Sequence, residues 1–202
     1  MKSFDGQMMS LEAKMNMCAS IAMAIMDMHS AGKRRTRIYV EKGANQEGII
    51  HGDIKPANIL IFKDAVNNYV PRVIDFGYST RLADAHERIP IPKSGFWTAP
   101  EHGSGSKSFA EARKMDAYSF GMLCLWLLFH TGQDAEECSL WYSLDLGYQA
   151  MAIASQVLST DTTLDGRPKE NLSKLFKHTL TGSPFDRSSD FEKFLKLLAP
   201  YK

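Results

Sequence analysis

The sequence predicts an α+β fold that is mainly α-helical and carries one small β-hairpin. Apolar residues recur at three- and four-residue steps after Ser10, a residue type that caps helices, and this spacing predicts an amphipathic helix. An almost uninterrupted apolar run over 115–129 indicates a second helix that passes through the core. β-prone runs at 58–62 and 69–74, separated by a mostly polar segment, predict the hairpin.

The first helix is expected to end at about Ala31, because Gly32 and a basic cluster follow. A mostly polar segment containing Gly43 and Gly48 is predicted to be a loop, and residues 49–50 form a short β-prone run. The apolar face of the helix consists of Leu11, Met15, Cys18, Ile21, Ala22, Ile25 and Met28.

The second half of the chain, from Trp141 onward, is predicted to be helical. Ser188 or Ser189 is expected to cap the last helix. The stretch 159–169 resembles a linker, and no internal repeat is found, so we expect one domain over residues 1–202. Helical spacing occurs at Leu172, Leu175, Phe176 and Leu180, and again at Phe191, Phe194, Leu195 and Leu198.

The composition is that of an ordinary globular protein, with 44% hydrophobic and 23% charged residues. A chain of 202 residues can bury about 70% of its unfolded surface, so it can form a stable core without disulfide bonds or structural metals. The formal net charge of +1 gives no broad positive field for nucleic acid or an anionic membrane, and the basic run at 33–37 is interpreted as a solvated loop. The apolar stretch 120–129 is shorter than the roughly twenty residues of a membrane span. We expect neither nucleic acid nor membrane as a partner.

The cysteines and the N-terminal residues favour a cytoplasmic location, with the nucleus as the alternative. Cys18, Cys124 and Cys138 are odd in number and lack CxxC spacing, which argues against a disulfide framework or a zinc site. Residues 1–7 contain no apolar signal segment.

Three motifs in a fixed order carry the chemistry. The segment 51–58 reads His-Gly-Asp-Ile-Lys-Pro-Ala-Asn, Asp-Phe-Gly begins at Asp75, and Ala-Pro-Glu ends at Glu101. One tripeptide alone is weak evidence, because Asp-Phe-Gly commonly marks the end of a strand entering a turn. In this order and spacing, the motifs resemble those of the eukaryotic-type protein kinases of the Ser/Thr type.

The resemblance implies a protein-kinase-like C-terminal lobe. Residues 51–58 would be its catalytic loop, 75–101 its activation segment and 115–129 its core helix. The implied function is that of a protein Ser/Thr kinase, which transfers a phosphoryl group from ATP to a protein hydroxyl. ATP and Mg²⁺ are the implied cofactors, and a protein with an acceptor Ser or Thr is the implied substrate.

The same resemblance assigns roles to residues of the catalytic loop. Asp53 would accept the proton of the substrate hydroxyl, and Lys55 would contact the transferred phosphate. Asn58 and Asp75 would hold Mg²⁺, a hard cation that suits oxygen ligands. Lys55 followed by Pro56 is closer to the Ser/Thr-type loop than to the tyrosine type. The alternative for Asp53 and Asn58 is turn chemistry, because both residue types bond their own backbone in turns.

Four further residues match the family by position. Ser94 lies near the place where Ser/Thr kinases carry a threonine that contacts the catalytic Asp and Lys, although it could equally be a polar loop residue. Asp116 resembles the aspartate that opens the buried helix and ties down the catalytic-loop backbone. Arg187 resembles the arginine that pairs with the glutamate of Ala-Pro-Glu, here Glu101.

The sequence departs from the family at Gly52 and over residues 32–46. Gly52 replaces an arginine that in many kinases binds a phosphorylated residue of the activation segment, which makes phosphate switching there doubtful. Residues 32–46 are extra relative to the short turn that the family usually has. Lys42 superficially resembles the ATP-binding lysine, but it follows a helix that the family places after the whole N-terminal lobe, so it is interpreted as solvated.

The N-terminal lobe of the family is expected to be absent, because too few residues precede Asp53 and no G-x-G-x-x-G occurs. Without that lobe the chain should bind ATP poorly, and an N-lobe or a partner should cover an apolar surface. Two alternatives to a protein kinase remain. One is a non-catalytic interaction module with the kinase fold. The other is a small-molecule phosphotransferase of the aminoglycoside or choline kinase kind, whose loop also reads His-Gly-Asp.

Overall fold

The structure is a computed structural model that describes residues 9–30, 48–81, 88–103, 105–130 and 146–199. The predicted features at 32–46, with Lys42 and the basic run, lie outside these residues, as do Cys138 and Trp141.

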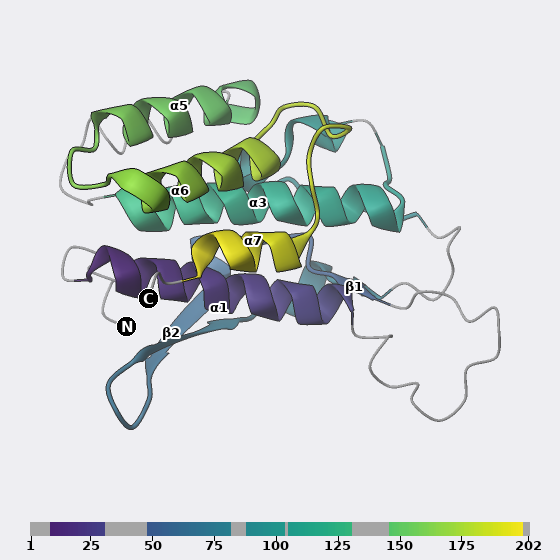
Figure 1. The fold of residues 1–202 in the computed structure, drawn as a ribbon. Helices are drawn as coiled ribbons and strands as arrows, with labels where there is room; N and C mark the ends of the chain where they lie inside the picture. The colour runs from purple at the N-terminus through teal and green to yellow at the C-terminus, as the bar shows by residue number, and fades with distance from the viewer. Residues whose placement is uncertain (1–8, 31–47, 82–87, 104, 131–145, 200–202) are drawn as a thin grey trace.

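Helices of the described chain are arranged in layers around α3 (Figure 1). The helices are α1 (Leu11–His29), α3 (Phe109–Phe129), α5 (Leu146–Thr160), α6 (Gly166–Thr179) and α7 (Phe191–Leu198). The strands are β1 (Ile49–Ile50), β2 (Ile59–Lys63), β3 (Tyr69–Val73) and β4 (Thr80–Arg81). Short 3₁₀ helices are η2 (Pro56–Asn58), η3 (Phe76–Tyr78), η4 (Gly95–Trp97) and η5 (Pro100–Gly103).

Helix α1 begins as its sequence predicts. The side chain of Ser10 accepts a hydrogen bond from the amide of Ala13 at 3.2 Å, which satisfies one of the amides left unpaired at a helix start. The helix ends at His29, slightly before the predicted end. Its apolar face is buried against α3, α7 and the hairpin strand β3.

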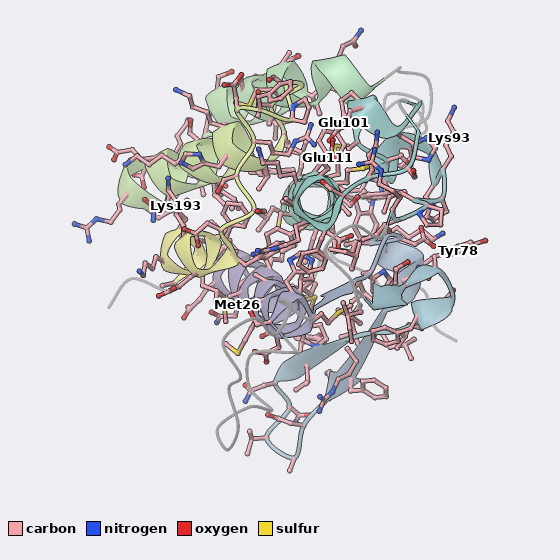
Figure 2. The ribbon with its side chains drawn as sticks, turned by 90° about the vertical axis from the view of Figure 1, so that its right-hand side faces the viewer. Met26, Tyr78, Lys93, Glu101, Glu111 and Lys193 are labelled. Atoms are coloured by element: carbon pink, nitrogen blue, oxygen red, sulfur yellow. The ribbon has the colours of Figure 1, made fainter. Side chains whose placement is uncertain are left out.

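Helix α3 is the centre of the core, and Figure 2 shows it nearly end-on with side chains around it. It begins at Phe109, earlier than the apolar run predicted, because Ser108 and Glu111 form a reciprocal capping box. From Met115 onward almost every side chain is buried, as expected of a helix that is apolar on all faces. No helix among the described residues is both long enough and apolar enough to cross a membrane.

The predicted hairpin is present as the antiparallel pair β2–β3, with Ile59 opposite Val73 and Lys63 opposite Tyr69. In its turn, the carboxylate of Asp64 accepts hydrogen bonds from the amides of Val66 and Asn68. The prediction of a mainly helical α+β fold with a small hairpin is therefore confirmed.

Strand β1 was predicted from the apolar β-prone pair Ile49–Ile50, but its antiparallel partner β4 was not, because Thr80 and Arg81 do not form an apolar run. Ile50 of β1 packs with Ile89 and Ala112 in a small apolar cluster beside the main core. In the main core, Cys18 of α1 and Cys124 of α3 interact as free thiols, and burial together with Cys18 raises the pKa of Cys124 well above its ordinary value.

Close packing at Gly121 generates a prediction about stability. A Cβ built there would lie 2.6 Å from the Cβ of Thr179 on α6, which is closer than real contacts allow. Gly121→Ala is expected to lower the free energy of unfolding by about 1–3 kcal/mol, in spite of the better helix propensity of alanine, which is worth about 1 kcal/mol.

Urea unfolding checks this prediction. Gly103→Ala is the control, because nothing lies within 4 Å of the added carbon, and it should change the free energy by less than about 0.5 kcal/mol. Equal effects of the two variants would contradict the packing argument.

Candidate active site

The backbone of the 51–58 loop is held by one carboxylate of the core helix. Asp116 of α3 accepts hydrogen bonds from the amide of His51 at 3.0 Å and from the amide of Gly52 at 2.9 Å. The glycine has a positive φ of 78°, a conformation that glycine adopts without strain. The side chain of His51 lies 3.1 Å from the carbonyl oxygen of Ile74, which joins the loop to the end of β3.

Asp53 lies at the centre of a group of polar contacts although only 3% of its surface is exposed. Its Oδ2 is 2.8 Å from Nζ of Lys55 and accepts a hydrogen bond of 3.0 Å from Nδ2 of Asn58. Its Oδ1 accepts a hydrogen bond from the hydroxyl of Ser94. The structure thus brings together Asp53, Lys55, Asn58 and Ser94, and all four were predicted from the sequence as candidate site residues.

These contacts determine the charge of Asp53. Burial alone would raise its pKa, because a buried carboxylate loses its hydration. Hydrogen bonds from Lys55 and Ser94, the positive charge of Lys55 and a hydrogen bond from Asn58 outweigh burial, so the pKa of Asp53 lies below its ordinary value of 3.8. The group is therefore a carboxylate at neutral pH, able to accept a proton or a hydrogen bond.

The hairpin brings the residue that precedes Asp75 next to Asn58. The amide of Ile74 donates to the carbonyl of Asn58 at 2.9 Å, so Asp75 follows directly after the paired end of β3. It is an exposed residue with a positive φ of 62°, and its carboxylate accepts a hydrogen bond from the amide of Gly77 at 3.2 Å. A non-glycine residue at positive φ is uncommon and is held by its surroundings.

The donor set at this edge of the hairpin fits Mg²⁺. Asn58 uses Nδ2 to donate to the backbone oxygen and to Oδ2 of Asp53, so the oxygen of its amide remains to ligate a cation. Together with the carboxylate of Asp75, it would supply two hard oxygen ligands. No cluster of three or more His, Cys, Asp or Glu side chains suited to a metal occurs among the described residues. Two protein ligands are enough for Mg²⁺, which keeps several waters and shares phosphate oxygens of its substrate.

Ser94 connects residues 94–98 to this group. Its amide donates to the hydroxyl of Thr98 at 2.6 Å, across the short helix η4. The carbonyl of Trp97, in the same helix, accepts a hydrogen bond from Ser119 of α3 at 2.7 Å. The segment that presents Ser94 to Asp53 is therefore fixed to the core helix.

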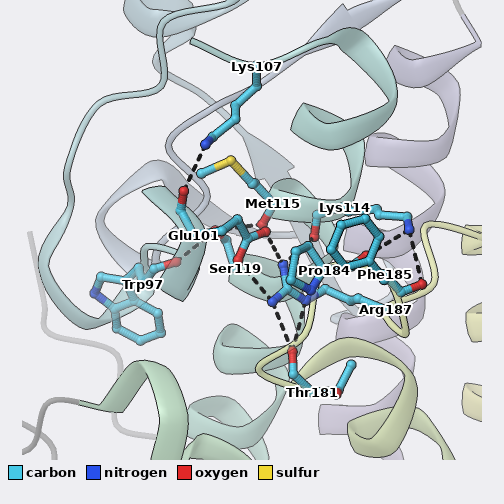
Figure 3. A network of polar contacts seen from close by, with 10 residues as sticks. All are labelled: Trp97, Glu101, Lys107, Lys114, Met115, Ser119, Thr181, Pro184, Phe185 and Arg187. Carbon is cyan, nitrogen blue, oxygen red and sulfur yellow. Dashed lines mark hydrogen bonds and ion pairs between the residues drawn. The ribbon is translucent and has the colours of Figure 1, made fainter. Parts of the chain in front are cut away.

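Glu101 and Arg187 form the predicted ion pair, which Figure 3 shows at the centre of a polar network. Nη2 of Arg187 lies 3.1 Å from Oε2 of Glu101 and 2.9 Å from the carbonyl of Thr181, and its guanidinium packs over the ring of Tyr118. The arginine is 2% exposed. The carbonyl of Glu101 accepts a hydrogen bond from Nζ of Lys107 at 2.8 Å.

Sequence reasoning missed two polar residues of these networks. His29, at the end of α1, lies 2.8 Å from the carboxylate of Asp116, and Lys107 is buried beside Glu101. A histidine at the last turn of an amphipathic helix is an ordinary feature, and a lysine in a loop is usually solvated. Only their contacts in the folded chain distinguish His29 and Lys107 from ordinary surface residues.

Removing one partner of the Glu101–Arg187 pair generates a second prediction. Glu101→Gln should lower the free energy of unfolding by about 3–5 kcal/mol, because the buried guanidinium then lacks its counter-charge. Chemical denaturation checks this. As control, Glu192→Gln removes one partner of the exposed Glu192–Lys196 pair and should cost less than about 1 kcal/mol. A loss equal to that of the control would contradict the assignment.

A third prediction concerns the pKa of Asp53. Ser94→Ala removes a hydrogen bond to the carboxylate and should raise this pKa above its value in the native protein, whereas Ser94→Thr keeps the hydroxyl and should not. Since the folded pKa is depressed, the stabilisation from Asp53 is present above pH 3.8 and is lost as the pH falls through the folded value. Ser94→Ala makes this contribution smaller.

Carboxyl-carbon NMR titration measures that pKa directly. Asp161, whose pKa is lowered by its hydrogen bonds with Thr163, serves as an internal control that should not change. An unchanged Asp53 in Ser94→Ala would show that the hydroxyl does not stabilise the carboxylate.

Comparison with known proteins identifies the family. The protein kinase domain family matches residues 8–197. The chain is 39% identical over 92 residues to the G-type lectin S-receptor-like serine/threonine-protein kinase SD2-2 of Arabidopsis thaliana, covering 45% of this chain and 10% of that protein. It is 42% identical over 82 residues to the serine/threonine-protein kinase PknB of Mycolicibacterium smegmatis, covering 39% of this chain and 12% of that protein.

A third relative is named for a different activity. Guanylyl cyclase C of Cavia porcellus is 29% identical over 119 residues, covering 59% of this chain and 8% of that protein. The chain thus spans 8 to 12% of the length of these three relatives. Because the family match extends over nearly the whole chain, this chain belongs to the protein kinase family.

Proposed function

We propose that this chain carries the catalytic part of a protein serine/threonine kinase. The observation on which this depends is the Asp53 carboxylate, which is held at once by Lys55, Asn58 and Ser94. In phosphoryl transfer the protein contributes positioning and charge more than covalent chemistry, and these residues supply both. The printed names of two relatives, each a serine/threonine-protein kinase, agree with it.

The roles follow from the contacts. Asp53 orients the acceptor hydroxyl and takes its proton, because it is ionised and lies beside the hydroxyl of Ser94. Lys55, with its side chain 28% exposed, reaches from Asp53 toward solvent and meets the negative phosphate. Asn58 and Asp75 hold Mg²⁺, which neutralises charge on the phosphates of ATP. Lys55 and Ser94 on one carboxylate favour a Ser or Thr hydroxyl of a protein as acceptor.

Transfer needs a second lobe, and we propose that the residues described here act as a C-terminal lobe. The printed sequence contains no G-x-G-x-x-G loop to cover the phosphates. An apolar cavity of about 510 Å³ opens between α1, the β2–β3 hairpin and α3. An N-lobe or another protein would cover this surface. The lining includes Met17, Ile21, Ile59, Ile61, Leu123 and Leu127.

The second candidate is a non-catalytic interaction module. It is favoured by the match to guanylyl cyclase C, a protein named for another reaction. Its cavity surface would then serve binding alone. Against it stands the intact set of Asp53, Lys55, Asn58 and Asp75, which a binding module does not need.

A fourth prediction tests the function. The chain alone should bind Mg–ATP weakly in calorimetry. The chain fused to a protein kinase N-lobe should transfer labelled phosphate to Ser or Thr peptides. Asp53→Asn in that fusion should lower the rate by at least about a hundredfold, since removal of a general base costs about 10²–10⁴. Asp186→Asn, away from the candidate catalytic loop, is the matched control.

Each alternative has its own outcome. Transfer to choline or an aminoglycoside but not to peptides would favour a small-molecule phosphotransferase, which the His-Gly-Asp of the loop also allows. A fusion that binds Mg–ATP without any transfer would favour the interaction module.

A further inference from the structure

Lys107 is a buried lysine that the proposed chemistry does not use. Only 3% of its surface is exposed, and it directly precedes Ser108, the residue that caps α3. Its ammonium group donates a hydrogen bond of 2.8 Å to the carbonyl oxygen of Glu101. Burying an ammonium group costs free energy unless acceptors replace its hydration. The contact therefore holds the lysine and the Glu101 peptide in a defined relative position.

The backbone of Lys107 holds a different part of the chain. The amide of Ile89 donates to the carbonyl of Lys107 at 2.8 Å, and the amide of Lys107 donates to the carbonyl of Ile89 at 2.9 Å. The side chain of Ile89 is completely buried and packs with Ile50 and Ala112. Because Ile50 directly precedes the 51–58 loop, this pairing places residue 89 beside the start of that loop and beside α3.

Both ends of one stretch of chain are therefore attached to a single residue. Residues 89–102, here called the 89–102 loop, are held by the backbone of Lys107 near their first residue and by its ammonium group near their last. A second contact closes the same loop, because Nε2 of His102 lies 2.7 Å from the carbonyl oxygen of Ile91. A carbonyl can only accept a hydrogen bond, so the imidazole is the donor.

Ser94 lies within the 89–102 loop, and its hydroxyl donates to Oδ1 of Asp53. Fixing the two ends of a loop restricts the positions that the residues between them can reach. The far end of the loop is held a second time, because the carboxylate of Glu101 pairs with Arg187. The position of the Ser94 hydroxyl therefore depends on how the loop is closed at its ends.

We propose that Lys107 is a positioning residue for Ser94. Its backbone holds Ile89, its ammonium group holds Glu101, and the closed loop keeps the hydroxyl of Ser94 at the carboxylate of Asp53. The cation that closes the loop is supplied by the chain itself. What Ser94 and Asp53 do rests on the function proposed above, whereas closure of the loop is a property of the fold.

Amide hydrogen exchange, measured by NMR on the whole chain, gives the fifth prediction. The probes are the amides of Ser94, Trp97 and Thr98, which all donate to acceptors within the 89–102 loop. In Lys107→Met their exchange, corrected for global stability, should accelerate by at least about tenfold, because a hydrogen bond from a charged donor is lost. Lys107→Arg keeps a cationic donor, so the same amides should exchange more slowly than in the methionine variant.

The matched control is Lys14→Met. The ammonium group of Lys14, on α1, also donates to a backbone carbonyl, that of Leu128 at 3.2 Å near the other end of α3. This variant loses a hydrogen bond of the same kind away from the 89–102 loop. The three loop amides should remain slow in it after the same correction.

The unmodified chain provides an independent measurement, should Lys107→Met not fold. A loop that is closed at Lys107 opens as one unit, so the amides of Ile89, Trp97, Thr98 and Lys107 should share one free energy of opening. Exchange at increasing low concentrations of denaturant measures that free energy for each amide.

The proposal is overturned if the Ser94, Trp97 and Thr98 amides exchange equally in Lys107→Met and in the unmodified chain, or if they exchange as fast with arginine as with methionine. Opening of Trp97 in the unmodified chain while Ile89 and Lys107 stay closed would overturn it too. Transfer by the fusion protein is measured separately. Loop amides that respond as expected in a fusion that never transfers phosphate would refute the proposed function and leave the positioning role. Unresponsive amides in an active fusion would do the reverse.

Discussion

The carboxylate of Asp116 links the hydrophobic core to the candidate site by accepting hydrogen bonds from the backbone of the 51–58 loop. It is the charged group among the buried residues of α3, and a charge in such a place must be met by hydrogen bonds or an opposite charge. Two of its donors are backbone amides of the 51–58 loop. The packing of α3 in the core therefore determines the path of the 51–58 loop. A change that displaces α3 is expected to displace the candidate site as well.

Residues 94–101 are fixed to the same part of the core by independent contacts. Trp97 accepts from Ser119, and Glu101 pairs with an arginine that follows α6. Between these anchors Ser94 reaches Asp53. The described part of the segment thus has its place set by side chains already in the fold, and none of these contacts requires an added phosphate. This agrees with the glycine at position 52, where many relatives of this family use an arginine to bind one.

Much of this could be predicted from the sequence. The resemblance to protein kinase motifs predicted Asp53, Asn58, Glu101, Asp116 and Arg187 as candidate site residues, because the motifs occur in the family's order. Periodicity found α1 and the body of α3, and alternation with a polar turn found the hairpin. What escaped were features made by distant residues. The pairing of β1 with β4 and the contacts of His29 and Lys107 depend on which segments meet in space, and no local pattern encodes that.

The glycine at position 52 has a consequence for how the loop is maintained. At its φ of 78° another residue would be strained, typically by about 1–3 kcal/mol, and a Cβ would lie 3.3 Å from the carbonyl of Tyr78. Glycine avoids this backbone strain because it has no Cβ. The loop of this chain therefore adopts its observed backbone conformation at position 52 without strain. The loop conformation held by Asp116 can therefore form without any bound ligand.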